Sequence, residues 1–477
     1  SFELDVLLCV LTLAATRFHE VTNMPFCKVD KFVRRSLGPN PFRAHDAIGA
    51  RGANFLTWSC LHHLAQHYGA LFSPSAVLEE HKDSGTNWYP PNHVRPLVNW
   101  SLDDETELET WVHGPLFQMA ALMVSEERSH LAQINAIGEL CAQFSRGVLA
   151  AIRARGATAA ISTVETYHRL HPEAATQAWH PEAFARIESP EWQQLYVNAE
   201  HDGEVGVISL SRESYSWDVD AEFNRAIDWL HKEKIERVIV TGDFHLATQM
   251  VGADTADFYP AMSDAAAGEA VAAGWSRTAR RLHDDFKVSV GLVNGKRCLG
   301  GMLELLMHCH YLVAVDGAEL GMPEVMLPVV PGMEGCHWPF RRMASEDWPR
   351  FLELLLTGRS VRSSEAVGWL ADFVGGLDDA LQIAYTVASG GEHGLEQRAL
   401  DDAALDNVVA AAPDLAPAAS PEMEAGRRAI LDAIRAATST TLGEALDVQA
   451  RHSGGFMTGD ACRRGVIGTA WKKTVLV

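Results

Sequence analysis

The sequence predicts an all-α region followed by a layered α/β domain. Before about residue 190, apolar residues recur at intervals of three and four, which is the period of a helix with one buried face. After it, short β-branched runs alternate with helical stretches, as expected for strands covered by helices. Ser189 and Pro190 mark the change, because proline interrupts regular structure.

The helical region is predicted to have two parts. In residues 1–97, helical periodicity is clear at 4–16 and 55–68, and a turn rich in Gly and Pro lies between them. Residues 98–190 begin with an acidic segment, followed by long helical patterns at 116–143 and 145–155. We interpret this second part as a helical connector or a second helical module.

Residues 191–477 hold the predicted α/β domain. A stretch rich in Ala and Pro, residues 403–421, predicts a connector before the terminal helices. We expect strands at 205–210, 237–241, 288–293 and 311–315, and helices at 221–233 and from about residue 300.

The composition argues against several classes of protein. The formal net charge is −22, and no run of Lys and Arg could follow a phosphate backbone, so nucleic acid is not an expected partner. The eight cysteines are scattered without a C-x-x-C pair, which argues against a zinc site or a disulfide framework. The apolar stretch at residues 4–15 is too short to span a bilayer. These features predict a cytoplasmic protein with no metal site and no membrane partner.

Three segments combine Gly, Pro and acidic residues in a way that indicates a site. They are residues 250–254, 293–304 and 321–335. In the second, Gly300 and Gly301 let the backbone approach a ligand closely at a helix start, where the first N–H groups are unpaired. A further N–H from the first segment would complete an oxyanion hole, which stabilises charge developing on a thioester oxygen. A tight turn explains each glycine pair equally well.

In this order, the three segments resemble the crotonase superfamily of enoyl-CoA hydratases and isomerases. The resemblance covers residues 191–477 and extends to Leu-Thr-Gly-Arg at 356–359, Ser-Glu-Ala at 364–366 and Phe-Met-Thr-Gly-Asp-Ala at 456–461. It implies a spiral of ββα units, an acyl-CoA thioester as substrate, and assembly into homo-oligomers, usually trimers or dimers of trimers.

The resemblance also implies roles for individual residues. The oxyanion donors would be the N–H groups of Ala253 and Gly301, and the catalytic carboxylates would be Glu304 and Glu324. Hydration uses both carboxylates, because one deprotonates the water attacking Cβ while the other delivers a proton to Cα. Without the resemblance, both glutamates would be interpreted as surface charges. The predicted substrate-binding positions are Val251, Gly252, Asp254, Gly300, Pro331, Gly332 and Glu334.

Some positions depart from the superfamily pattern. Glu334 stands where a glycine is usual, and Cys-His-Trp at 336–338 replaces a Thr-Gln-Arg-like run. Glu334 is either a third carboxylate that shifts the pKa of its neighbours or selects an unusual substrate, or a solvated loop residue. Residues 211–215 lack the Asn- and Ala-rich run that faces CoA in the superfamily.

Residues 1–97 resemble the helical C-terminal domain of 3-hydroxyacyl-CoA dehydrogenases. The resemblance is carried by residues 29–31, 37–49, 71–75 and 85–89. No strand followed by G-x-G-x-x-G occurs in the sequence, so we find no site for NAD. Either an NAD-binding domain lies upstream of the given sequence, or the helical region serves dimerisation.

The sequence therefore predicts an enoyl-CoA hydratase, a lyase of fatty-acid β-oxidation that needs no cofactor for hydration. With an upstream NAD domain it would belong to a bifunctional dehydrogenase–hydratase. The first alternative is an isomerase or another enolate-forming enzyme of the superfamily. The second alternative is a non-catalytic acyl-CoA-binding scaffold that recruits a dehydrogenase. Acyl-chain length does not follow from the sequence.

Overall fold

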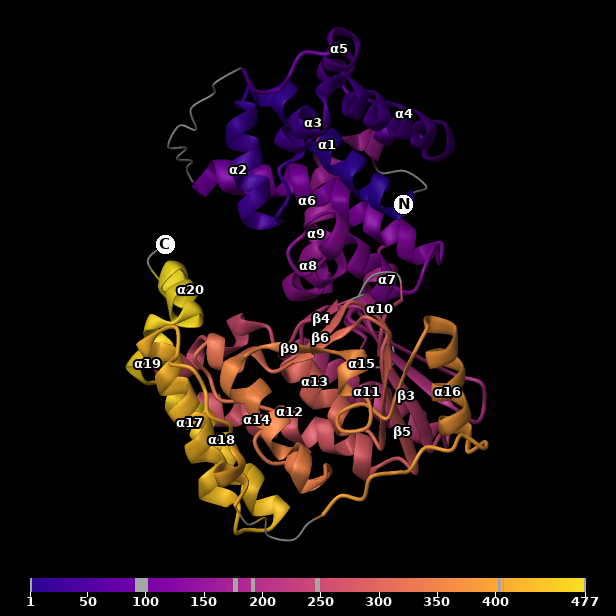
Figure 1. Ribbon diagram of the computed structural model, residues 1–477. Coiled ribbons are helices and arrows are strands. Elements are labelled where there is room, and N and C mark those ends of the chain that lie inside the picture. Colours follow the sequence, from indigo (N-terminus) through magenta and orange to yellow (C-terminus); the bar gives the residue numbers. More distant parts are fainter. Residues whose placement is uncertain are drawn as a thin grey trace. The chain divides into compact units, whose positions relative to one another are not determined.

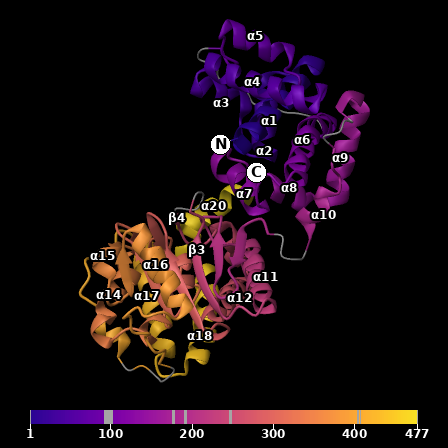
Figure 2. The ribbon, with the colours of Figure 1, turned by 90° about the vertical axis from the view of Figure 1, so that its right-hand side faces the viewer.

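The computed structural model describes residues 2–90, 102–174, 179–189, 194–244, 249–401, 405 and 407–475. The chain divides into two compact units, Ser1–Leu195 and Tyr196–Val477 (Figures 1 and 2). The domain boundaries predicted at 97/98 and 190/191 lie outside the described residues. No helix among those residues has both the length and the apolar character needed to cross a membrane.

The first unit is helical wherever it is described. Helix α1 packs against α4 and α6, and α6 packs against α9, so the apolar faces predicted from the three- and four-residue spacing meet in one core. The predicted helical region is confirmed. Its helices are α1 (Phe2–Thr22), α2 (Phe26–Ser36), α3 (Pro41–Ile48), α4 (Ala50–Tyr68), α5 (Ala76–Ser84), α6 (Leu102–Ser125), α7 (Leu131–Ala136), α8 (Val148–Arg155), α9 (Ala157–Leu170) and α10 (Ala183–Glu188).

The prediction of one long helix over residues 116–143 is wrong. Helix α6 ends at Ser125, and Glu127 adopts a left-handed conformation with a φ of 50°. The N–H of Arg128 then donates to the carbonyl of Met123 at 3.2 Å, which satisfies a carbonyl that the helix leaves unpaired. The sequence pattern conceals this helix end because the left-handed residue is Glu rather than the usual Gly.

The second unit has two sheets among its described residues. In the six-stranded sheet, of order β1-β2-β3-β5-β7-β10, only the β1–β2 pair is antiparallel. Its strands are β1 (Val197–His201), β2 (Gly206–Leu210), β3 (Arg237–Gly242), β5 (Val288–Val293), β7 (Tyr311–Val315) and β10 (Phe373–Gly375). The four-stranded sheet joins β4 (Gln249–Met250), β6 (Arg297–Leu299), β8 (Glu319–Gly321) and β9 (Ser360–Arg362).

Along the chain, strands of the two sheets alternate in a regular order with helices. A strand of the larger sheet is followed by a strand of the smaller sheet and then by a helix, in the order β3-β4-α12, β5-β6-α13 and β7-β8-α14. This repetition is the spiral of ββα units that the sequence predicts, and the predicted fold class is confirmed. The helices are α12 (Ala265–Asp284), α13 (Gly301–Met307) and α14 (Trp348–Thr357).

Helices cover both faces of the larger sheet. On one face, Ile239 and Val290 pack against Ala384 and Val387 of α16 (Leu377–Ser389). Helices α11 (Trp217–Lys232), α12 and α13 contact the sheet as well. A parallel sheet covered in this way has apolar side chains on both faces, which explains the continuous β-branched runs in the sequence.

The terminal helices close the second unit. They are α17 (Pro421–Ala437), α18 (Leu442–Met457), α19 (Asp460–Arg464) and α20 (Val466–Val475). Helix α18 lies against α12, and Gly454 faces the other backbone so closely that an added Cβ would lie 2.4 Å from the carbonyl oxygen of Ala265. Only a residue without a side chain permits this approach.

We expect Gly454→Ala to lower the free energy of unfolding by about 1–3 kcal/mol, because its Cβ would force the two helices apart. The neighbouring Gly455 has no atom within 4 Å of an added Cβ, so Gly455→Ala is a matched control. That control should stabilise the helix by roughly 0.5–1 kcal/mol, since alanine is the better helix former. Urea unfolding of both variants checks the prediction, and equal midpoints would contradict it.

Candidate active site

The first element of the site is the loop after β4, which carries Ala253. The N–H of Tyr215 donates to the carbonyl of Gly252 at 2.8 Å, and the N–H of Asp254 donates to the carbonyl of Tyr215 at 2.7 Å. These bonds fix the backbone on both sides of Ala253. Among the described residues, none accepts a hydrogen bond from the N–H of Ala253 itself.

The second element is the start of α13. Gly300 has a φ of 54°, and Gly301 opens the helix with an N–H that has no intrahelical partner. A Cβ added at Gly301 would lie 3.8 Å from the amide nitrogen of Ala253. The two predicted oxyanion donors therefore lie next to each other, although they are far apart in the sequence.

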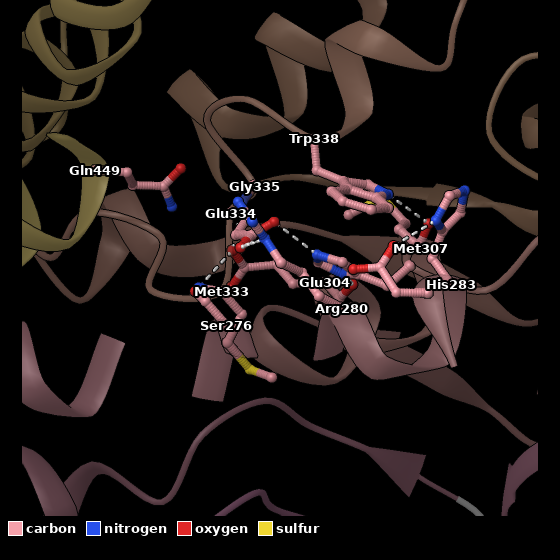
Figure 3. A network of polar contacts seen from close by, with 12 residues as sticks. Ser276, Arg280, His283, Glu304, Met307, Met333, Glu334, Gly335, Trp338 and Gln449 are labelled. Atoms are coloured by element: carbon pink, nitrogen blue, oxygen red, sulfur yellow. Dashed lines mark hydrogen bonds and ion pairs between the residues drawn. The ribbon is translucent and has the colours of Figure 1, made fainter. Parts of the chain in front are cut away.

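Glu304 lies in the first turn of α13 with a side chain that is 1% exposed. Its Oε1 accepts hydrogen bonds from the N–H of Met333 at 3.0 Å and the N–H of Gly335 at 2.7 Å (Figure 3). A Cβ added at Gly335 would lie 2.8 Å from this oxygen. The loop at 333–335 therefore fixes the direction of the Glu304 carboxylate.

Glu324 lies in the short 3₁₀ helix Pro323–Met326 and is 8% exposed. A Cβ added at Gly300 would lie 2.5 Å from Oε1 of Glu324, so this carboxylate reaches the turn that precedes Gly301. Its Oε2 is buried, and no described residue forms a hydrogen bond with it. An unpaired buried carboxylate oxygen is costly and suggests a chemical role.

The two glutamates influence each other electrostatically. Burial and the charge of Glu334 together raise the pKa of Glu304 to about 7, against the opposite effect of the amides of Gly335 and Met333. Burial and the charge of Glu304 raise the pKa of Glu324 well above its usual range. Carboxylates that share a dry site cannot all ionise, so the arrangement favours one acid beside one base at neutral pH.

Glu334 is a buried member of the site and not a solvated loop residue, since its side chain is 1% exposed. Arg280 of α12 donates from Nε to its Oε1 at 2.8 Å. His308, directly after α13, contacts its Oε2 through Nε2 at 2.9 Å. Of the two interpretations of Glu334 from the sequence, the solvated one is wrong.

The other predicted binding positions surround this centre in different ways. Val251 is 37% exposed, whereas Asp254 forms an ion pair with Arg212 at 3.0 Å. The carbonyl of Pro331 accepts from Nε2 of Gln449 at 2.6 Å, and that of Gly332 accepts from Oγ of Ser276 at 3.3 Å. Asp254, Pro331 and Gly332 thus have structural partners within the chain. Whether they contact substrate stays a prediction.

Sequence reasoning missed part of the site. Cys336 is fully buried, and burial together with the charges of Glu304 and Glu324 raises the pKa of its thiol. Its position in the departing 336–338 segment was the only signal. Arg280 had no signal at all, because a single Arg in an amphipathic helix is normally a surface charge.

Two of the hollows among the described residues lie away from this centre, and none of the predicted site residues lines either of them. One, of about 960 Å³, lies within the first unit between α1, α3 and α4. The other, of about 420 Å³, lies in the second unit near Arg342 and Arg398. Among the described residues, no group of three or more His, Cys, Asp or Glu is arranged to hold a metal ion.

Comparisons with known proteins find relatives over part of the chain. A probable enoyl-CoA hydratase from Mycobacterium bovis is 31% identical over 175 residues, which are 36% of this chain and 64% of the relative. The sequence is similar to enoyl-CoA hydratases. A fatty acid oxidation complex subunit alpha from Idiomarina loihiensis is 33% identical over 147 residues, 31% of this chain and 20% of that protein. The chain thus spans less than two thirds of these relatives' length.

Solved structures with a similar fold are less similar in sequence to this chain. A crystal structure of a carnitinyl-CoA dehydratase from Mycobacterium thermoresistibile has 18% sequence identity and a TM-score of 0.43, covering 59% of this chain and 90% of that one. No family model matches the chain.

Proposed function

We propose that this chain hydrates a 2-enoyl-CoA thioester. The observation that carries the proposal is the convergence of two buried carboxylates, Glu304 and Glu324, beside the amides of Ala253 and Gly301, for which the described part of the chain provides no acceptor. The sequence similarity to enoyl-CoA hydratases supports the same assignment.

The two amides would bind the thioester oxygen. Water that attacks Cβ of the enoyl group pushes an electron pair onto this oxygen and forms an enolate. Two fixed N–H groups, which need no reorientation during the reaction, stabilise that charge more than the neutral ground state. The N–H groups of Ala253 and Gly301 suit this task, since no described residue competes for them.

The two carboxylates would divide the proton transfers. Glu324, whose pKa is raised well above its usual range, would be the acid that gives a proton to Cα. Glu304, whose pKa is about 7, would be the base that takes a proton from the attacking water. The hydroxyl adds to Cβ and the proton to Cα, and a proton exchanged with solvent restores the pair. We expect hydration to need no cofactor.

The direct test is to incubate the purified chain with crotonyl-CoA and to follow the loss of the conjugated thioester. Mass spectrometry should show the mass of the substrate plus one water. Formation of a conjugated product from a 3-enoyl-CoA, without any hydration, would replace the proposal by the isomerase alternative. Binding of the thioester without turnover, with a copurifying dehydrogenase, would replace it by the scaffold alternative.

Gly335→Ala should reduce hydration by about 10²-fold, because its Cβ would displace the Glu304 carboxylate, and misplacing a catalytic group by about 1 Å has an effect of this size. A Cβ added at Gly455, in α18 and outside the site, meets no atom within 4 Å, so Gly455→Ala is the matched control. Steady-state kinetics of both variants measures the two rates of hydration and tests the prediction. Similar losses in both would mean that an added methyl group acts through the stability of the domain, and not through Glu304.

We further propose that the chain acts together with a dehydrogenase. The resemblance of residues 1–97 to a dehydrogenase domain and the similarity to a fatty acid oxidation complex subunit support this arrangement. The product of hydration, a 3-hydroxyacyl thioester, is the compound that such a dehydrogenase would oxidise.

A further inference from the structure

Glu334 adopts a backbone conformation that is unusual for a residue with a side chain. Its φ is 78°, in the left-handed region that favours glycine. The N–H groups on either side of it, those of Met333 and Gly335, both point at Oε1 of Glu304. Successive amides brought together by a left-handed residue form a concave site for an anionic oxygen. The conformation of Glu334 is therefore what allows this loop to bind Glu304.

The side chain of Glu334 is held by two groups from different elements. Arg280 donates from Nε at 2.8 Å, and His308 contacts the other carboxylate oxygen at 2.9 Å. The Nδ1 of His308 lies 2.7 Å from the backbone carbonyl of Glu304, which can only accept, so Nδ1 carries a hydrogen. A second hydrogen must lie between Nε2 and the carboxylate, because two acceptors would repel each other.

These contacts form a closed ring around Glu304. From its backbone carbonyl, the ring passes through His308 to the carboxylate of Glu334. From the backbone of Glu334 it returns through the amides of Met333 and Gly335 to the Glu304 carboxylate (Figure 3). Trp338 stacks on His308 with ring centroids 4.2 Å apart, and its backbone N–H donates to the carbonyl of Glu334 at 2.9 Å.

A left-handed residue outside glycine persists only where its surroundings hold it in place. In this loop the holding groups act on the side chain. We propose that Glu334 is a positioning residue whose carboxylate, anchored by Arg280 and His308, maintains the loop that orients Glu304 for proton transfer. The inference rests on the proposed function in taking Glu304 as the reacting base.

Glu334 acts on Glu304 through its charge as well as through its position. Titratable groups around Glu304 come from several elements: Glu334 and Cys336 from the loop, Glu324 from the 3₁₀ helix, and, through Glu334, Arg280 and His308. The negative charge of Glu334 raises the pKa of Glu304. Its removal also leaves the Arg280 cation without its partner, so both changes favour ionised Glu304.

The test measures the titration of Glu304 directly in the protein without substrate. Infrared difference spectra of protein labelled with ¹³C-glutamate, assigned by their loss in Glu304→Gln, give the pH midpoint of this carboxyl. In Glu334→Gln, which keeps the shape and removes the charge, we expect the midpoint to fall by about one pH unit. We expect kcat to fall about tenfold with little change in KM, since an interaction that acts only in the transition state is lost.

Four further variants separate positioning from general stability. Glu334→Gly, which adopts the left-handed conformation without any anchor, should lower kcat as Glu334→Gln does. Arg280→Lys, which keeps the charge, should retain more activity than Arg280→Gln. Arg281→Gln is the matched control, because Arg281 pairs with Asp228 and Asp285 instead.

The outcomes are distinct. An unchanged Glu304 midpoint and an unchanged kcat in folded Glu334→Gln would overturn the proposal, even if the variant unfolds more easily. The same shift in Arg281→Gln would also overturn it. If the wild-type chain shows no hydration, the proposed function fails, and the infrared midpoint still decides whether Glu334 controls Glu304.

Discussion

Replacing Glu324 by Gln is expected to reduce the rate of crotonyl-CoA hydration by about 10²–10⁴-fold, the usual contribution of a positioned acid or base. The amide has the shape of the carboxyl group but cannot give up a proton to Cα. Because Glu324 is buried and its Oε2 has no hydrogen-bond partner among the described residues, no neighbouring group is in place to substitute for it.

Steady-state kinetics of Glu324→Gln measures this effect, and the loss should fall on kcat, with KM changed much less. Glu319→Gln is a suitable control, because Glu319 lies five positions earlier on the exposed side of β8 and should leave the rate unchanged. Circular dichroism should show that both variants remain folded. A wild-type rate in Glu324→Gln would remove the two-carboxylate mechanism.

The stability of the protein is expected to fall as the pH rises through 7, by roughly 3 kcal/mol for Glu304 alone. Burial raises the pKa of this group from 4.5 to about 7. Folded Glu304 therefore binds its proton more tightly than unfolded Glu304 does. The stabilisation is complete below pH 4.5, where both states are protonated, and is lost as the pH rises to about 7 and above.

The comparison that isolates Glu304 is urea unfolding of the wild type and of Glu304→Gln at several values between pH 5 and pH 8. The difference in the free energy of unfolding should move in favour of the variant as the pH rises, because Gln does not ionise. Glu324, whose pKa is also raised, contributes in the same direction. A difference that does not depend on pH would mean that Glu304 titrates normally and is in contact with solvent.

Much of the fold could be predicted from the sequence because its signals are local. The β-branched runs at 237–241 and 288–293 form β3 and β5, and the three- and four-residue spacing at 55–68 lies in α4. The strands of the smaller sheet could not be recognised. They are two or three residues long, too short for any alternation to show, and their pairing partners lie far away in the sequence.

Part of the candidate site could likewise be predicted from the sequence, and part could not. Ala253, Gly301, Glu304 and Glu324 could be named from motifs, because these residue types occur at positions that resemble a known family. The contacts of Glu334 could not be named. Its partner Arg280 comes from a helix more than fifty residues away. No local sequence pattern predicts which carboxylate this Arg will pair with.

By itself, the sequence determined which chemical groups the chain carries, their order, and the elements that local periodicity specifies. That Glu304, Glu324 and Glu334 lie together and are buried follows only from the folded chain. Burial and mutual proximity set the protonation of these carboxylates, and both depend on contacts between distant parts of the chain. The residues of the site could therefore be identified from the sequence, whereas the protonation states that would let them react depend on the folded structure.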